Sequence, residues 1–248
     1  MATPRRFALL ACEMLFREAC ACAARSPNVV DPVFLPKALH DVGKPGMSAR
    51  LQEAIDRIDA ARYDAILLGY GLCSNGVEGL RSRATLVLPR AHDCITLLLG
   101  SKERYADVFG KNPGTYFKSP GWLERGEDAA AAGAGTIPAR LGMGRSFEEL
   151  KARFGEENAK YLMETMTGWE KAYSKLAYID TGVGDAPAYK ELTRREAERR
   201  GWTYEELPGS LALLQRLVDE EWDAPDFLVV PPGRTLKPTY GDDVVGLA

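Results

Sequence analysis

A histidine stands two residues before a cysteine in the segment AHDC, residues 91–94. The chain has 248 residues but only two histidines and five cysteines, so a pairing of these types is conspicuous. Thiolate and imidazole are the groups that zinc prefers in proteins, and thiolates also hold iron–sulfur clusters. One His-x-Cys pair is too small for either site, so the chemistry depends on which other side chains reach the same point.

Four candidate ligands share one feature, which is that each follows a strand-like apolar run. They are Cys12 after residues 6–11, Cys73 after residues 63–70, and His92 with Cys94 after residues 83–88. In open α/β sheets, ligands bind beyond the carboxyl ends of the strands. We therefore predict that these four side chains form a site for zinc or an iron–sulfur cluster. The alternative is that the cysteines pack as small apolar residues and the histidine caps a loop.

Three further side chains are candidates for catalysis beside such a site. His40 follows the second strand-like run and could reach the same edge or cap the next turn. Glu13 begins a helix beside Cys12, as a general base, a further ligand or a charge that offsets the helix dipole. Tyr116, in GTYF, is a candidate hydrogen-bond donor from a lid, or a packed aromatic residue.

Candidate cofactor-binding residues lie in both halves of the chain. Arg17 stands one helical turn after Glu13, and Asp180 and Thr181 begin the glycine turn DTGVGD. A glycine turn before a helix can accept an anion, but two aspartates favour hydroxyl or amine contacts instead. Arg234, in VVPPGRT, is predicted at the same edge as a carboxylate clamp, or else as a surface arginine.

The order of apolar and helical segments predicts an α/β fold. Strand-like runs at residues 6–11, 29–35 and 63–70 alternate with helical patterns, and runs at 175–180, 202–207 and 226–230 repeat that order. We predict two Rossmann-like βαβαβ lobes with parallel sheets, related as a pseudo-repeat. The expected domains are an N-terminal lobe at 1–110 with the Cys/His site, a loop and helical insertion at 111–175, and a C-terminal lobe at 176–248.

Composition excludes several classes of partner. The net charge is −3 and the sequence has no arginine-rich block, which argues against nucleic acid. No segment approaches the roughly 20 apolar residues of a membrane span. An odd number of cysteines in a chain of this length is untypical of a secreted disulfide framework, so we expect a cytoplasmic protein.

A set of motifs resembles the uncharacterised DUF1638 family over residues 7–233. They are ACE with a following RE, LPKALHD, GYGLCSNG, HDC, GTYF and YIDTG. The resemblance implies that the four candidate metal ligands and His40 stand at recognisable positions of the family. It also implies relatives in methanogens and anaerobic bacteria, some encoded near corrinoid methyl-transfer proteins. The Ala/Gly-rich stretch at residues 129–135 departs from the family pattern.

Three functions remain open. The first is a zinc-dependent methyl or alkyl transferase, similar to the thiol methyltransferases of corrinoid systems, with Cys73, His92 and Cys94 holding the ion. Cys12, or Glu13 in its place, would be the exchangeable fourth ligand, and the helix start beside Cys12 predicts a lowered thiol pKa. The second is an iron–sulfur lyase or dehydratase with His92 as acid or base. The third is a non-catalytic, metal-stabilised partner of a methyl-transfer complex. The expected partners are a small thiol or methyl donor and a corrinoid protein.

Overall fold

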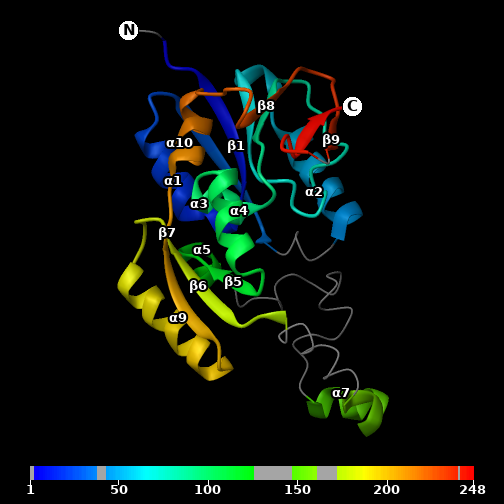
Figure 1. The fold of residues 1–248 in the computed structure, drawn as a ribbon. Helices are drawn as coiled ribbons and strands as arrows, with labels where there is room; N and C mark the ends of the chain where they lie inside the picture. Colours follow the sequence, from blue (N-terminus) through cyan, green and yellow to red (C-terminus); the bar gives the residue numbers. More distant parts are fainter. Residues whose placement is uncertain (1–2, 38–42, 126–146, 161–171, 240) are drawn as a thin grey trace.

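The protein contains two main sheets, built largely of parallel strands, that lie one beyond the other and share a hydrophobic core. The computed structural model describes residues 3–37, 43–125, 147–160, 172–239 and 241–248. Figure 1 shows the larger sheet in the upper part of the molecule and the smaller sheet below it, with α9 on its outer side.

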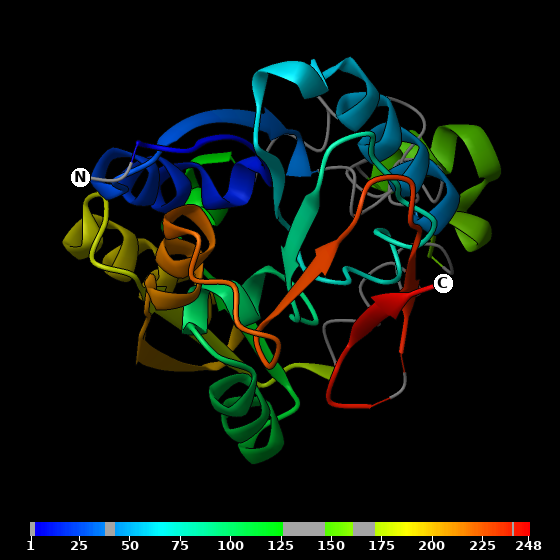
Figure 2. The same cartoon turned by 90° about the horizontal axis from the view of Figure 1, so that it is seen from above.

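The larger sheet has five strands in the order β2-β1-β3-β4-β8. Their bounds are β1 Arg6–Cys12, β2 Val29–Leu35, β3 Ala65–Gly69, β4 Leu86–Pro89 and β8 Phe227–Val230. The first four strands run parallel, and β8 pairs with β4 antiparallel. Figure 2 shows β8, in orange, lying beside β4.

Helices cover both faces of this sheet, which explains the continuous apolar runs of its central strands. Residues 7–11 of β1 are buried on both faces, as is usual for parallel sheets. One face packs on α1, α3 and α10, and the other on α2. The helix bounds are α1 Phe16–Arg25, α2 Gly43–Arg57, α3 Cys94–Leu99 and α10 Ala212–Asp219.

The smaller sheet has three parallel strands in the order β5-β6-β7. Their bounds are β5 Thr115–Lys118, β6 Lys175–Asp180 and β7 Thr203–Pro208, and α9 spans Ala186–Arg200. Ala177 and Ile179 of β6 belong to the same buried cluster as Phe7 and Leu9 of β1. The two sheets therefore share a core rather than folding around separate ones.

Short elements complete the described chain. They are η1 Glu13–Leu15, η3 Ala60–Arg62, α4 Lys102–Lys111, α5 Pro120–Arg125, α7 Phe147–Phe154, and the hairpin of β9 Leu236–Pro238 with β10 Val245–Leu247. Asp93 caps α3 by accepting hydrogen bonds from the amides of Ile95 and Thr96. None of the helices in the described ranges is long and apolar enough to cross a membrane.

The structure confirms the predicted α/β class with parallel sheets, but it does not confirm the pseudo-repeat of two βαβαβ lobes. The run at residues 226–230 was expected beside β6 and β7, yet it forms β8 of the larger sheet. The place beside β6 is taken by β5, from a segment expected to be a loop. The stretch at residues 129–135 lies outside the described residues.

Candidate functional site

Three cysteines lie at the carboxyl ends of three neighbouring strands. Cys12 is the last residue of β1, Cys73 stands in the loop after β3, and Cys94 begins α3 after β4. The loops after β3 and β4 run side by side, because the amide of Leu72 donates to the carbonyl of Ala91 (2.8 Å) and that of Cys73 to the carbonyl of His92 (2.9 Å). Their side chains therefore emerge at one edge of the sheet, as predicted from chain order.

The loop that carries Cys73 has an unusual backbone. A Cβ on Gly71 would lie 2.6 Å from the amide nitrogen of Asp93, so only glycine allows the two loops to approach this closely. Cys73, Ser74 and Asn75 then have φ values of 46, 54 and 66°. Three consecutive left-handed residues other than glycine cost roughly 1–2 kcal/mol each. Backbone strain of this kind is concentrated at functional sites.

Burial raises the pKa of all three thiols. The pKa of Cys12 is raised to about 11 and that of Cys73 to about 12, and that of Cys94 lies well above 9. Burial is the largest cause in each case. The thiolates also raise one another's pKa, because charge on Cys12 acts on the other two and charge on Cys73 acts on Cys94. All five cysteines of the chain are free thiols, so the three lie close together without a disulfide.

The prediction that the helix start lowers the pKa of Cys12 is wrong. The backbone amide of Met14 does lower it, but the loss of hydration on burial is the larger effect. Without a neighbouring positive charge of sufficient strength, the Cys12 thiol stays protonated at neutral pH.

The structure places His92 differently from the cysteines. The His92 side chain is exposed and stacks on Tyr105, with ring centroids 5.7 Å apart. Tyr105 in turn donates to Asp93 (3.3 Å), the residue that caps α3. His40 lies outside the described residues, so its predicted role stays a prediction.

The thiols fit a soft divalent cation by their chemistry, although they are not arranged as a finished ligand set. Among the side chains that the structure describes, no three or more Cys, His, Asp or Glu residues are grouped so as to hold a metal ion. Three neighbouring thiols, of which Cys73 is buried and Cys12 and Cys94 are partly buried, are nevertheless the donors that zinc prefers. Binding an ion requires Cys12, Cys73 and Cys94 to turn toward a common point and to lose their protons.

Glu13 lies beside Cys12 and is held by two partners. Its Oε1 accepts a hydrogen bond from the amide of Lys37 (2.9 Å), and its Oε2 lies 3.6 Å from a guanidinium nitrogen of Arg125. Lys37 also places its ammonium over the ring of Trp122, 4.6 Å from the ring centroid. Glu13 is thus a positioned carboxylate next to the thiols rather than a freely rotating surface charge.

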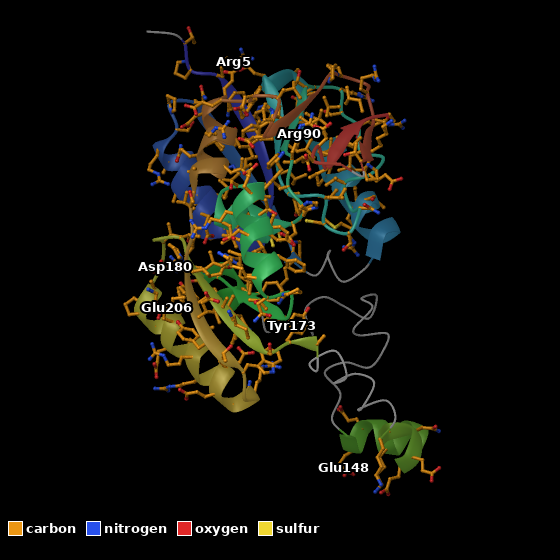
Figure 3. All side chains as sticks on the ribbon, in the orientation of Figure 1. Arg5, Arg90, Glu148, Tyr173, Asp180 and Glu206 are labelled. Atoms are coloured by element: carbon orange, nitrogen blue, oxygen red, sulfur yellow. The ribbon has the colours of Figure 1, made fainter. Side chains whose placement is uncertain are left out.

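Tyr116 lies on β5 within an aromatic cluster. Its ring is 5.8 Å from that of Trp122 and 5.5 Å from that of Tyr173, both at nearly right angles. Figure 3 marks Tyr173 just before β6, in the lower part of the molecule. This placement corresponds to the packed aromatic residue that the sequence left open as the alternative to a lid.

The structure brings together three of the predicted cofactor-binding residues. Thr181 donates to Glu18 of α1 (2.9 Å), and a Cβ on Gly184 would lie 3.1 Å from Cδ of Arg17. Asp180 accepts from Lys190 (2.8 Å), and Figure 3 shows it at the upper end of β6, toward the larger sheet. The end of β6 and the beginning of α1 therefore meet at one joint.

Arg234 lies elsewhere than Arg17, Asp180 and Thr181. Its guanidinium donates to the backbone carbonyl of Ala248 (2.8 Å), beside the hairpin of β9 and β10. Its predicted role as a carboxylate clamp stays a prediction.

Sequence reasoning missed two buried polar residues, Tyr70 and Glu18. Tyr70 follows β3 directly, and only its position between two glycines at a strand end marked it. Glu18 lies on the buried face of α1 with Ala19 and Cys22, in line with Leu15 at the end of η1, so an acidic residue at apolar helical spacing was the signal. Both have a buried polar atom without a hydrogen-bond partner among the described residues, namely Tyr70 Oη and Glu18 Oε2.

The fold and the site define an α/β protein with a thiol cluster at the strand ends of its larger sheet. Residues 34–218 match the family described as "Protein of unknown function (DUF1638)". This match covers most of the chain, which therefore belongs to the DUF1638 family, as the sequence motifs predicted. No curated protein and no solved structure matches the chain. Cys73 and Cys94 lie inside the matched segment, whereas Cys12 precedes it.

Proposed function

We propose that this protein binds one zinc ion through Cys12, Cys73 and Cys94 and uses it in thiol or methyl-group transfer. The observation that carries the proposal is the convergence of three thiols from neighbouring strand ends, one buried and two partly buried, close enough for their charges to interact. Three protonated thiols stabilise one another little when they lie together at the edge of a hydrophobic core, where the dielectric constant is low. A divalent cation offsets the charge that three thiolates would otherwise concentrate there.

Cys12, Cys73 and Cys94 would hold the ion as thiolates, and a zinc ion with three protein ligands would remain open to an exchangeable group, as in catalytic sites. When bound, a zinc ion of this kind lowers the pKa of a coordinated substrate thiol and leaves a nucleophilic thiolate. The substrate sulfur then forms a bond to the alkyl carbon while the bond from that carbon to its donor breaks, and the donor keeps the electron pair.

This chain's own residues have separate roles in the proposal. Cys73 and Cys94 come from adjacent loops and fix the ion, and Cys12 completes the set from β1. Glu13, held beside Cys12 by the Lys37 amide, accepts the proton of the substrate thiol. His92 is the group that would close the fourth position if its ring left Tyr105. The link to a corrinoid methyl donor rests on the family resemblance alone.

Elemental analysis of the full chain purified without oxygen tests the proposal. We expect about one zinc per wild-type chain, and none in Cys73→Ser. Cys20→Ser is the matched control, because Cys20 lies on α1 away from the strand ends and its loss removes the same number of thiols. Full metal content in Cys73→Ser, or a metal-free wild type, would refute the site.

The same preparation distinguishes the alternatives. A brown protein that contains iron and absorbs near 400 nm would replace zinc by an iron–sulfur cluster. A zinc protein that binds no small thiol but binds a partner protein would indicate a non-catalytic member of a transfer complex.

A further inference from the structure

Glu18 is a buried acidic residue at the contact between the two sheets, and the proposed chemistry does not use it. It lies on α1, which follows the first strand of the larger sheet, and its side chain is fully buried. Its Oε1 accepts a hydrogen bond from the hydroxyl of Thr181 (2.9 Å), directly after β6 of the smaller sheet. One neutral hydroxyl therefore joins the carboxyl to the other sheet.

The environment of Glu18 favours the protonated carboxyl. Burial raises the pKa of Glu18 above its usual 4.5, because an ionised carboxyl loses its hydration inside the protein. Glu124 of α5 raises the pKa further, and Arg17 of α1 lowers it. The guanidinium of Arg17 donates to Glu124 (2.6 Å), and the hydroxyl of Tyr189 on α9 donates to the same oxygen. The nearby cation is thus directed to the neighbouring carboxylate.

Two further titratable groups interact with the charge of Glu18, and neither supplies a positive charge. They are Tyr178 of β6 and Cys22 of α1, whose pKa values are raised chiefly by burial and in part by Glu18. A carboxylate accepts up to about four hydrogen bonds, so the hydroxyl of Thr181 cannot satisfy it alone. Hydration of an ionised Glu18 therefore requires the end of β6 and α1 to separate.

The strand ends of the smaller sheet are joined to one another and would move together. The amide of Gly209, after β7, donates to the carbonyl of Asp180 at the end of β6 (2.7 Å). The next amide, that of Ser210, donates to the carbonyl of Leu98 in α3 (2.9 Å), which packs on the larger sheet. Figure 1 shows α1 and α3 above the upper ends of β6 and β7. The bond from Ser210 to Leu98 therefore reports whether the two sheets are in contact.

We propose that Glu18 is a pH-sensitive contact between the two sheets, which holds the end of β6 against α1 while its carboxyl is protonated and releases it when the carboxyl ionises. Each sheet keeps its own strands paired in the released state, and the contact acts whether or not a metal binds at the cysteines. The protonated form stabilises the closed state fully below pH 4.5, and this stabilisation is lost as the pH rises toward the pKa of folded Glu18. The released state gains up to about tenfold in population per pH unit over that interval.

Amide hydrogen exchange of the full-length protein, followed by NMR from about pH 4 to about pH 8, tests this contact. Protection is taken relative to an unstructured peptide at the same pH, which removes the intrinsic effect of pH. The amide of Ser210 reports the contact between the sheets, and that of Ile66, which donates to Thr85 (2.8 Å), reports the larger sheet alone. In the wild type we expect the protection of Ser210 to fall by up to about tenfold more per pH unit than that of Ile66.

Two variants assign the effect to Glu18. Glu18→Gln cannot ionise, so its ratio of Ser210 to Ile66 protection should stay constant with pH. Glu198→Gln is the matched control, because Glu198 is exposed on α9 and its loss removes one carboxyl from the same sheet without touching the contact. Its ratio should follow that of the wild type.

A constant ratio in the wild type would overturn the proposal, because Glu18 would then act on global unfolding alone or not at all. This outcome does not depend on the folding of any variant. A ratio that changes with pH to the same extent in the wild type and in Glu18→Gln would also overturn it, since another group would then control the contact.

Discussion

The hydroxyl of Thr181, at the end of β6, donates a 2.9 Å hydrogen bond to the carboxyl of Glu18 on α1. This bond joins the smaller sheet to the helix that follows the first strand of the larger one. Glu18 is fully buried, and Thr181 is the one side chain shown to donate to it among the described residues. This hydrogen bond is one of several contacts there, beside the ion pair of Arg17 with Glu124 and the hydrophobic core that the two sheets share.

Thr181→Val should weaken this joint while keeping the shape of the side chain. Loss of the donor leaves the buried carboxyl of Glu18 without a partner, which costs about 1–3 kcal/mol in the free energy of unfolding. Thr203→Val is the control, because that threonine is exposed on β7 and should change stability by less than about 0.5 kcal/mol. Urea unfolding of both variants measures the difference, and equal midpoints would contradict the assigned importance of the contact.

Glu18→Gln should change how stability depends on pH. Burial raises the pKa of Glu18 above its usual 4.5, with Glu124 adding to the increase and Arg17 opposing it. Just above pH 4.5 this carboxyl is deprotonated in the unfolded chain but still protonated in the folded one. The stability that the protonated carboxyl contributes at lower pH is therefore lost as the pH rises toward the pKa of the folded state. The glutamine variant has no such loss and should gain stability relative to wild type over that interval. Thermal unfolding at several pH values would show parallel curves for the two proteins if the carboxyl were not perturbed.

Much of the fold could be predicted from the sequence, because the apolar runs matched what buried parallel strands require. The buried runs of β1 and β3 could only be central parallel strands, and chain order then placed Cys12, Cys73 and Cys94 at one edge. The position of β8 could not be derived in the same way, because its apolar run FLVV fits either sheet equally well. Its antiparallel pairing with β4 depends on tertiary contacts that periodicity does not encode.

The sequence predicted which cysteines lie together at the site, but it did not predict their pKa values. A helix start after Cys12 suggested a lowered pKa, yet the result depends on burial, which chain order does not reveal. Tyr70 was also hidden, because a tyrosine after a strand is usually a packing residue. That its hydroxyl is buried and has no partner among the described residues is a three-dimensional property, which the sequence does not reveal.

Gly121→Ala should destabilise the contact between α5 and η1. A Cβ on Gly121 would overlap the carbonyl oxygen of Met14, which is backbone and cannot rotate away. Overpacking of this kind costs about 1–3 kcal/mol, and a backbone clash belongs at the upper end. Gly110→Ala, in α4 with nothing within 4 Å of its Cβ, should instead gain about 0.5–1 kcal/mol. Chemical unfolding of the pair would contradict this account if both changes had the same sign.

Ser74→Gly should stabilise the metal-free protein and weaken metal binding. Ser74 has a φ of 54°, and glycine removes a conformational cost of about 1 kcal/mol. The freed loop would hold Cys73 less rigidly, so the metal affinity should fall. Glu220→Gly provides the comparison, because Glu220 has a φ of 68° at the end of α10, far from the thiol loops in sequence. It should gain stability without any change in metal content, and a loss of metal in both variants would argue against a role for the strained loop.

Cys12→Ser and Cys94→Ser should separate an exchangeable ligand from a fixed one. The loops of Cys73 and Cys94 are joined by backbone hydrogen bonds, from the amide of Leu72 to Ala91 and from that of Cys73 to His92. Cys12 comes from β1 and is followed by η1, so its contribution is geometrically independent of the other two. We therefore expect Cys12→Ser to keep most of its zinc but to lose binding of 2-mercaptoethanol, whereas Cys94→Ser should lose both. Zinc analysis and thiol titration of the two variants side by side measure this, with Cys20→Ser as the control. If Cys12→Ser empties the site as completely as Cys94→Ser, then Cys12 is a structural ligand and not an exchangeable one.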